Sequence, residues 1–216
     1  LCKKGSYVES WAVNNNQPYI LTDGGDEENI FSGKIGNRFT WTLDKRTGVL
    51  SVEGTGDMPA FNEDNAPWRD YASYITEVKI SKGITAIGEK NFYNLSNLET
   101  VEFSDDVTRI DYGAFWNCHK LKNIIWGKGI TTLSSRAFQD CDSLTALVIP
   151  ESVQYIEHIA FGYCDNLKSV TIPCTLKEMS SVFSTCTSLE QVVIEVDEDF
   201  NCGLEMIDYE NFYECP

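Results

Sequence analysis

Apolar residues return every 23 residues over most of the chain. Counting from Ile84, the first, fourth, ninth and fifteenth positions are apolar in five successive copies, once a one-residue deletion in the fifth copy is allowed for. Leucine fills the fifteenth position and phenylalanine the ninth in every copy. The ninth positions are Phe92, Phe115, Phe138, Phe161 and Phe183. A fixed period of this length predicts a solenoid built of stacked copies.

Each copy also predicts its own local structure. An apolar, polar, apolar run near the end of the copy, as in Leu147 to Ile149, has the period of a short strand. The segment before position twelve is too short for a full helix and predicts a turn or one helical turn. One such unit cannot bury its own apolar side, so we expect copies to stack at strand spacing, roughly 4.8 Å, into continuous ladders.

The first 71 residues carry a different pattern, which predicts a β-rich N-terminal cap over 1–71. Alternating apolar residues on both sides of the turn "DKRTG" predict a β-hairpin at about 39–53. Pro67 suits the first turn of a short helix at about 67–75, which would lay Trp68 on the first copy. A cap is expected because the exposed end of a solenoid needs cover.

The repeat array is predicted to occupy 72–216. It divides into a half repeat at 72–83, full repeats that start at 84, 107, 130, 153 and 176, and a truncated repeat from 204.

Five of the eight cysteines share one position of the repeat. Position twelve holds Cys118, Cys141, Cys164, Cys186 and, in the truncated copy, Cys215, while the first copy has Leu95 there. A residue that leucine can replace predicts a buried thiol, whereas a zinc site would bring several thiolates to one point. Cys2, Cys174 and Cys202 lie off this ladder, and a disulfide between Cys174 and Cys202 stays an open alternative.

The composition of the chain excludes some classes of binding partner. A chain of 216 residues with 42% hydrophobic residues can bury a sizeable core. Its formal net charge of −16 argues against nucleic acid and anionic membranes, which both need a basic surface. The chain contains no run of eighteen apolar residues, so we do not expect direct membrane insertion. The start "LCKKGSYVESW" lacks the apolar stretch of a secretory signal, so we interpret the chain as a trimmed mature segment.

No pattern predicts catalysis, and we expect neither an enzyme nor a cofactor. His119 and His158 fall at different positions of their copies, and no nucleophile elbow, zinc-protease motif or phosphate loop is present. Glu195, Asp197 and Asp199 are weak calcium candidates, as is the acidic run from Asp23. Neither cluster has the alternating ligand spacing of a known calcium loop, which favours solvated acidic loops.

The copy "LTALVIPESVQYIEHIAFGYC", residues 144–164, closely resembles the leucine-rich repeats of the BspA-like surface protein family. The stretch "FTWTLDKRTGVLSVEGTGDMPAF" also resembles the N-terminal cap of gut-bacterial members. This resemblance implies a right-handed leucine-rich-repeat solenoid with a β-rich cap. It further implies a secreted or surface-attached bacterial protein that acts in adhesion or binding.

Two surfaces are candidates for ligand binding. On the face that bears the strands, the residues flanking the inward positions include Glu102, Asn123, Ile125, Val148, Thr171 and Val193. Ile125 and Val148 would form a small hydrophobic centre with a polar rim. Along the other edge, position ten is interpreted as an aromatic stripe that is interrupted by Gln139 and Ser184 and consists of Tyr93, Trp116, Tyr163 and Tyr213. These aromatics would stack on sugars, anchor a protein, or simply cover the phenylalanine ladder.

We therefore expect an extracellular or cell-surface binding module, monomeric, whose partner is a host or neighbouring-cell surface protein held on the strand face. A carbohydrate-binding accessory module and a structural spacer are the alternatives.

Overall fold

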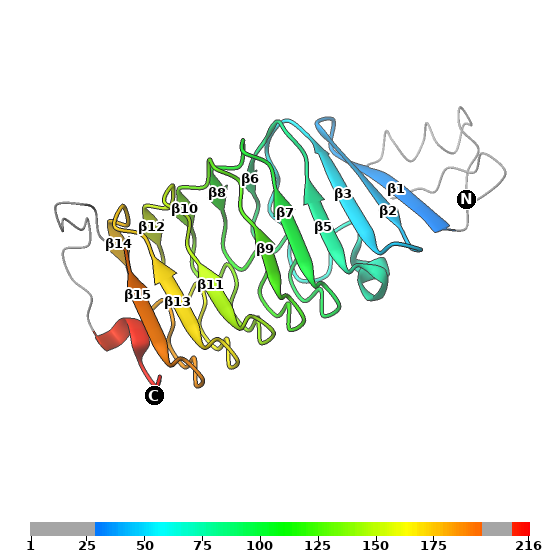
Figure 1. Cartoon of the computed structure of the whole chain (residues 1–216). Coiled ribbons are helices and arrows are strands. Elements are labelled where there is room, and N and C mark those ends of the chain that lie inside the picture. The colour runs from blue at the N-terminus through cyan, green and yellow to red at the C-terminus, as the bar shows by residue number, and fades with distance from the viewer. Residues whose placement is uncertain (1–28, 196–208) are drawn as a thin grey trace, which may run out of the picture.

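The computed structural model describes residues 29–195 and 209–216. The chain forms an elongated solenoid in which each of the five full copies contributes one strand to each of two lines (Figure 1). The first line contains β5 (Glu77–Ile80), β7 (Thr100–Phe103), β9 (Asn123–Ile125), β11 (Ala146–Val148), β13 (Ser169–Ile172) and β15 (Gln191–Ile194). The second contains β6 (Ile84–Ile87), β8 (Arg109–Ile110), β10 (Thr132–Leu133), β12 (Tyr155–Ile156) and β14 (Glu178–Met179). We call these the long-strand line and the short-strand line, and they confirm the predicted solenoid.

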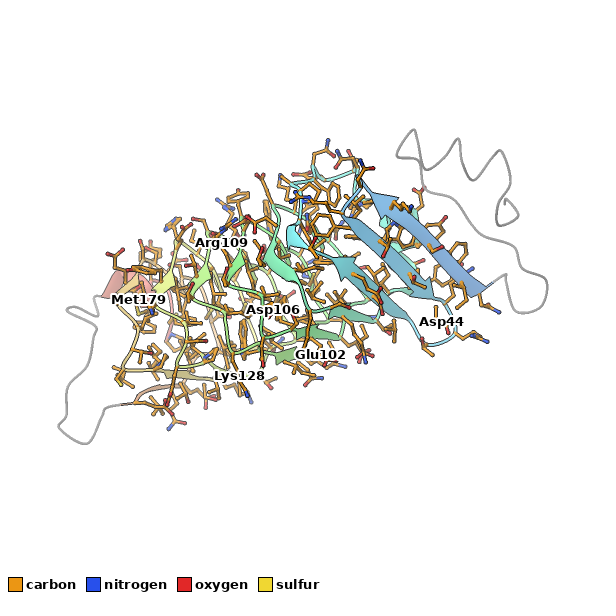
Figure 2. All side chains as sticks on the ribbon, turned by 90° about the horizontal axis from the view of Figure 1, so that it is seen from above. Asp44, Glu102, Asp106, Arg109, Lys128 and Met179 are labelled. Carbon is orange, nitrogen blue, oxygen red and sulfur yellow. The ribbon has the colours of Figure 1, made fainter. Side chains whose placement is uncertain are left out.

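Strands of adjacent copies pair in parallel, with partners one repeat apart. Thr100 pairs with Asn123, and Ala146 pairs with Ser169. Because the register equals the repeat, residues at one position of the copy lie above one another, and side chains fill the space between the two lines (Figure 2).

The phenylalanines of position nine form one continuous stack through the core. The rings of Phe92, Phe115, Phe138 and Phe161 follow one another at centroid separations of 5.0–5.2 Å. The stack continues through Phe183 to Phe212 at 5.9 Å per step. All but Phe212 are buried, so this ladder is a main contributor of buried apolar surface.

The cysteines of position twelve form a second ladder, which confirms their structural assignment. Cys118, Cys141, Cys164 and Cys186 are fully buried. Each thiol donates to the carbonyl oxygen of the position-nine phenylalanine one copy earlier, as Cys118 does to Phe92 O at 3.3 Å. Burial raises the pKa of the Cys118 thiol to about 12 and that of Cys141 well above its usual value, which keeps both protonated and unreactive.

An antiparallel meander precedes the copies. It contains β1 (Ile30–Ile35), β2 (Phe39–Asp44) and β3 (Val49–Gly54), and β3 then pairs in parallel with β5. The meander therefore continues the long-strand sheet, while β4 (Gly56–Asp57) pairs with β6 at the start of the short-strand sheet. The boundary at residue 71 between a cap and the array stays a prediction.

The expected helix at 67–75 is a shorter 3-10 helix, η2 (Arg69–Tyr74). Trp68, directly before it, is fully buried and stacks on Phe92 at a centroid separation of 5.1 Å. Its indole Nε1–H donates to Asn91 O at 2.9 Å. Trp68 thus covers the first ring of the phenylalanine stack.

The last described segment extends the array. It contains η3 (Tyr209–Phe212), in which Phe212 adds a ring to the stack, and Cys215, whose thiol donates to Phe183 O at 3.1 Å. Positions nine and twelve of the truncated copy therefore follow the repeat, while residues 204–208 lie outside the described ranges.

The pairing along the long-strand line is interrupted at one place. Sheet pairing runs from β1 to β9 and resumes from β11 to β15, with no pairing of β9 to β11. The short-strand sheet is continuous from β4 to β14 past the same point. The break is thus local to one face of the solenoid.

Candidate binding surfaces

The hydrophobic centre predicted on the strand face lies at the break. Ile125 in β9 is 50% exposed and Val148 in β11 is 61% exposed, and the two strands face each other across the gap. Asn123 is exposed beside them, whereas Glu102 and Thr171 are half-buried. Val193 is exposed two copies further along, in β15. The structure therefore brings Ile125 and Val148 together and leaves the other four candidates distributed along the face.

Trp126 accounts for the break. Between the next two copies, the N–H of Ile149 donates to Thr171 O at 3.0 Å. Trp126 and Val148 hold the corresponding positions, yet Val148 O accepts the indole Nε1–H of Trp126 at 3.1 Å. The same indole stacks on Phe103 at 6.1 Å and packs edge-on against Phe138 at 5.7 Å. The indole thus stands between the two strands and takes an acceptor that a backbone N–H takes elsewhere.

The gap forms a shallow groove of about 340 Å³. Its lining contains the side chains of β9 and β11 together with Trp126 and Leu144. The sequence analysis did not single out Trp126 and did not predict the groove. The size of the Trp126 side chain could have indicated an irregularity here, because the other copies have phenylalanine or isoleucine at this position.

The N-terminal half of the aromatic edge is occupied by contacts within the protein. Tyr93 and Trp116 pack edge to face at 5.3 Å, and the guanidinium of Arg136 lies 5.3 Å from the centre of the Trp116 ring system. The Trp116 indole N–H donates to Asp140 Oδ2 at 2.8 Å, and the guanidinium of Arg69 lies 5.7 Å from the Tyr93 centroid. Both rings are half-buried, so the structure offers little open ring surface here.

Tyr163 was assigned to the wrong position of the repeat. Its N–H donates to Ser184 O, just as Asn117 N–H donates to Gln139 O, which aligns Tyr163 with Asn117 at position eleven. Residues at this position share a positive φ, 59° for Tyr163 and 63° for Asn117. Position ten of this copy is therefore Gly162, and the aromatic edge has no side chain there. The error arose because the aromatic residue stands one place after the expected position.

Tyr163 and Tyr213 nevertheless lie in one place. They line a hollow of about 560 Å³ near the C-terminal end, together with Ile159 and Ser184. Tyr163 is 41% exposed and Tyr213 is 55% exposed. This is the open part of the predicted aromatic edge.

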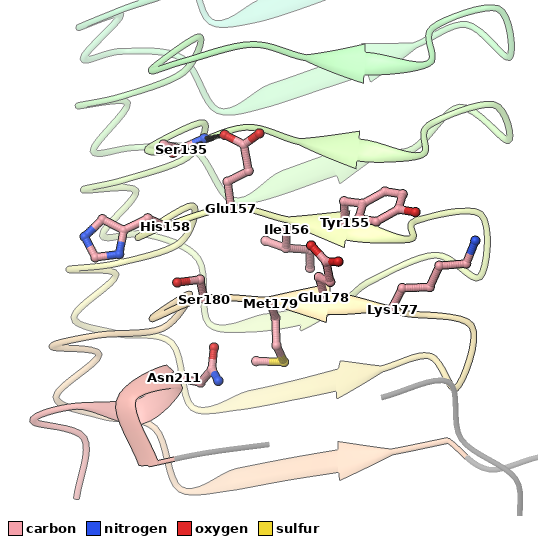
Figure 3. Close-up of a pocket in the computed structure, with 10 residues that line it drawn as sticks. All are labelled: Ser135, Tyr155, Ile156, Glu157, His158, Lys177, Glu178, Met179, Ser180 and Asn211. Atoms are coloured by element: carbon pink, nitrogen blue, oxygen red, sulfur yellow. Dashed lines mark hydrogen bonds between the residues drawn. The ribbon is translucent and has the colours of Figure 1, made fainter. Parts of the chain in front are cut away.

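A second hollow of about 560 Å³ lies on the short-strand line (Figure 3). The Lys177 ammonium lies 5.7 Å from the centroid of the Tyr155 ring, and Glu157 Oε2 accepts from the N–H and the hydroxyl of Ser135 at 2.9 and 3.1 Å. In Figure 3 His158 points away from Tyr155 and Lys177. The polar groups in this hollow therefore do not converge on one point.

Several predicted sites fall wholly or partly outside the described residues. Asp197 and Asp199 do so, as do the acidic run from Asp23 to Glu28 and Cys202, the proposed partner of Cys174. Glu195 is described and exposed, directly after β15. Within residues 29–195 and 209–216, no three histidine, cysteine or acidic side chains cluster in a way that could hold a metal ion. The calcium and disulfide hypotheses stay predictions.

The fold defines a leucine-rich-repeat solenoid. A family model described as "BspA type Leucine rich repeat region" matches six copies over residues 70–190, which is more than half of the chain. The protein therefore belongs to the BspA-type leucine-rich-repeat family, as its repeat predicted.

Solved structures show the same architecture. A leucine-rich repeat protein from Eubacterium ventriosum is 23% identical, with a TM-score of 0.55 over 76% of this chain and 60% of that one. The T. pallidum leucine-rich repeat protein TpLRR is 20% identical, with a TM-score of 0.59 over 75% and 83%. The pneumococcal vaccine antigen PcpA is 19% identical, with a TM-score of 0.55 over 70% and 38%. At these identities the likeness concerns the fold, and this chain spans 60% of the Eubacterium protein.

A comparison with curated proteins finds no match. Among the helices that the structure describes, none combines the length and the apolar character needed to cross a membrane.

Proposed function

We propose that this protein is a non-enzymatic, extracellular binding or adhesion module of a bacterial surface or secreted protein. Its ligand is a protein on the surface of a host or neighbouring cell, bound on the long-strand face. The observation that carries this proposal is the pair Ile125 and Val148, two exposed aliphatic side chains on either side of the break between β9 and β11. The family supports the class of module, since BspA-type repeats occur in bacterial surface proteins.

Burial of these side chains supplies a driving force for association. At about 25 cal/mol per Å² of apolar surface removed from water, an aliphatic pair with a polar rim can serve as the centre of an interface. Asn123 and the ion pair of Lys122 with Glu99, 3.2 Å between Nζ and Oε2, lie at the rim. Such a centre is typical of a protein interface, in which a few well-placed apolar residues contribute most of the affinity.

The break favours a polypeptide over other ligands. Since β9 and β11 do not pair with each other, both strands lack the ladder partners that the other copies supply, although Val148 O accepts from the Trp126 indole. An unpaired strand edge is a template for another chain, because an extended segment can supply the missing donors and acceptors. A peptide segment that enters the groove would also contact Val148 and the accessible part of the half-buried Trp126 side chain.

A binding screen tests this proposal. The purified protein is applied to an array of host extracellular-matrix proteins, together with Ile125→Asp and Val148→Asp. Tyr155→Asp is the matched control, because it adds the same charge to an exposed side chain of the short-strand line. We expect binding to at least one matrix protein that both strand-face variants weaken by tenfold or more and Tyr155→Asp leaves unchanged. Binding that all three variants retain would place the site elsewhere, and no binding at all would favour a spacer.

A further inference from the structure

The hollow between Tyr163 and Tyr213 is built from three successive copies. Tyr163 N–H donates to Ser184 O at 2.9 Å, and Thr185 N–H donates to Tyr213 O at 2.6 Å. These bonds place the copy that contains Ser184 directly between the copies that contain the two tyrosines. A short side chain therefore separates two exposed rings along the edge of the solenoid.

The two rings lack the cover that the other edge aromatics have. Tyr93 and Trp116 contact each other and lie beneath the cations Arg69 and Arg136. At the place of Arg136 in the repeat, the next copy has Ile159, which shares the same positive φ. Among the described residues, neither Tyr163 nor Tyr213 has a stacking or cation–π contact. Their ring surfaces are accordingly available to a ligand.

The floor of the hollow is apolar, and its aliphatic side chain packs beside a glycine. A Cβ on Gly162 would lie 2.1 Å from Ile159 Cγ2, so the isoleucine occupies the space above a residue without a side chain. Ile159 is half-buried and lines the hollow together with Ser184. The result is a recess with an aliphatic floor and two aromatic walls.

Polar groups surround this recess. Ser181, Ser184 and Thr185 lie along it, and His158 and Glu214 line its margin. The Ser184 hydroxyl donates to Ser181 O at 2.9 Å, and the Thr185 hydroxyl lies 3.5 Å from Glu214 Oε2. The lining therefore combines the Thr185 hydroxyl and the Glu214 carboxylate with an apolar surface, while the Ser184 side chain is buried.

We propose that this hollow binds one ring of a neutral hexopyranose glycan. The apolar C–H face of a pyranose packs on the electron-rich face of a tyrosine, while its hydroxyls need hydrogen-bonding partners around the rim. An aromatic side chain of a peptide could pack against the two tyrosine rings, but it would leave the polar groups around the hollow without hydrogen-bonding partners. Glu214 and the net charge of −16 disfavour sialylated and sulfated glycans. The site lies apart from the groove at β9 and β11, so it does not depend on the proposed protein ligand.

The test is a titration of the intact chain with methyl glycosides of glucose, galactose, mannose and N-acetylglucosamine, followed by NMR. Sialic acid serves as the anionic comparison. We expect one or more neutral glycosides to bind and sialic acid not to bind. Tyr213→Ala and Tyr163→Ala are each expected to weaken binding by about tenfold, since a truncated aromatic anchor typically costs this much or more.

A third variant fills the site instead of opening it. Ser184→Tyr places an aromatic ring at position ten, where Tyr93 and Tyr213 already stand, and should abolish glycoside binding while the circular dichroism spectrum stays native. Tyr112→Ala is the matched control, because it removes an exposed tyrosine from another copy and should leave binding unchanged. The proposal is overturned if no neutral glycoside binds at millimolar concentration, if sialic acid binds as tightly as the neutral glycosides, or if Ser184→Tyr binds as the parent does.

Discussion

The indole N–H of Trp126 donates to the carbonyl oxygen of Val148, and this single bond stands where the neighbouring copies have a backbone pair. A bulky side chain at one position of one copy thus interrupts the long-strand sheet, while the short-strand sheet beneath it remains continuous. A strictly repetitive sequence would give a uniform surface with no preferred place to bind. The exception at Trp126 provides a distinct place on an otherwise regular face.

Trp126→Ile should close the break. Isoleucine is the residue at this position in the next two copies, Ile149 and Ile172, which are paired. Without the indole, the N–H of residue 126 can donate to Val148 O and Thr145 N–H can donate to Lys122 O. We expect hydrogen exchange at residues 126 and 145 to slow roughly fivefold, which corresponds to about 1 kcal/mol for one backbone hydrogen bond. Binding of the proposed protein ligand should weaken in the same variant.

Phe103→Ile is the control for that experiment. It removes an aromatic ring from the same repeat position one copy earlier, where β7 and β9 are already paired. It should lower the melting temperature without any gain in amide protection. If Trp126→Ile likewise gives no gain at residues 126 and 145, the indole is not what separates β9 from β11.

Much of this fold could be predicted because the repeat supplies the same evidence in every copy. Position nine is phenylalanine each time, so the ring stack follows from the period alone. The errors occur where one copy departs from the rest. Trp126 matches an apolar position in chemistry but not in size, and the period contains no information on how strands accommodate a larger ring. Tyr163 was misplaced because side-chain type guided the alignment, whereas the positive φ at position eleven fixes the true register.

The surroundings of the Cys141 thiol determine the expected effect of Cys141→Ser. A hydroxyl buried in an apolar column without a partner would cost about 1–3 kcal/mol. The Cys141 thiol already points at Phe115 O, with 3.5 Å between sulfur and oxygen, so a serine hydroxyl has an acceptor nearby. We therefore expect a loss of about 1 kcal/mol, at the lower end of that range, in the free energy of unfolding measured with urea. Cys141→Asp, which buries a carboxylate in the same column, should unfold the array. A serine variant that lost ligand binding at unchanged stability would contradict the structural role of the cysteine ladder.

Asp57 links the start of the short-strand sheet to the copies that follow and gives the fold a pH dependence. The hydroxyl of Thr85 in β6 donates to Asp57 Oδ1 at 2.6 Å, and Arg109 Nη2 in β8 donates to Oδ2 at 3.3 Å. The Thr85 hydrogen bond, and to a smaller extent Arg109, lowers the pKa of Asp57 below its ordinary value. A lowered pKa in the folded state means that the ionised carboxylate stabilises the fold. This stabilisation is complete above the pKa of the unfolded chain, about 3.9, and is lost as the pH falls through the lower folded value.

Asp57→Asn should therefore destabilise the protein at pH 7 and make little difference near pH 2. Because the Asp57 side chain is 57% exposed, solvent screening limits the expected loss at pH 7 to less than about 1 kcal/mol. Urea denaturation at pH 7, 5 and 2 measures both effects. Asp64→Asn is the matched control, since the exposed Asp64 carboxylate has no hydrogen bond to another described residue, and it should leave the stability unchanged at each pH. An Asp57→Asn penalty that is equally large at all three pH values would show that the carboxylate acts through packing, because a contribution from its charge must disappear when both states are protonated.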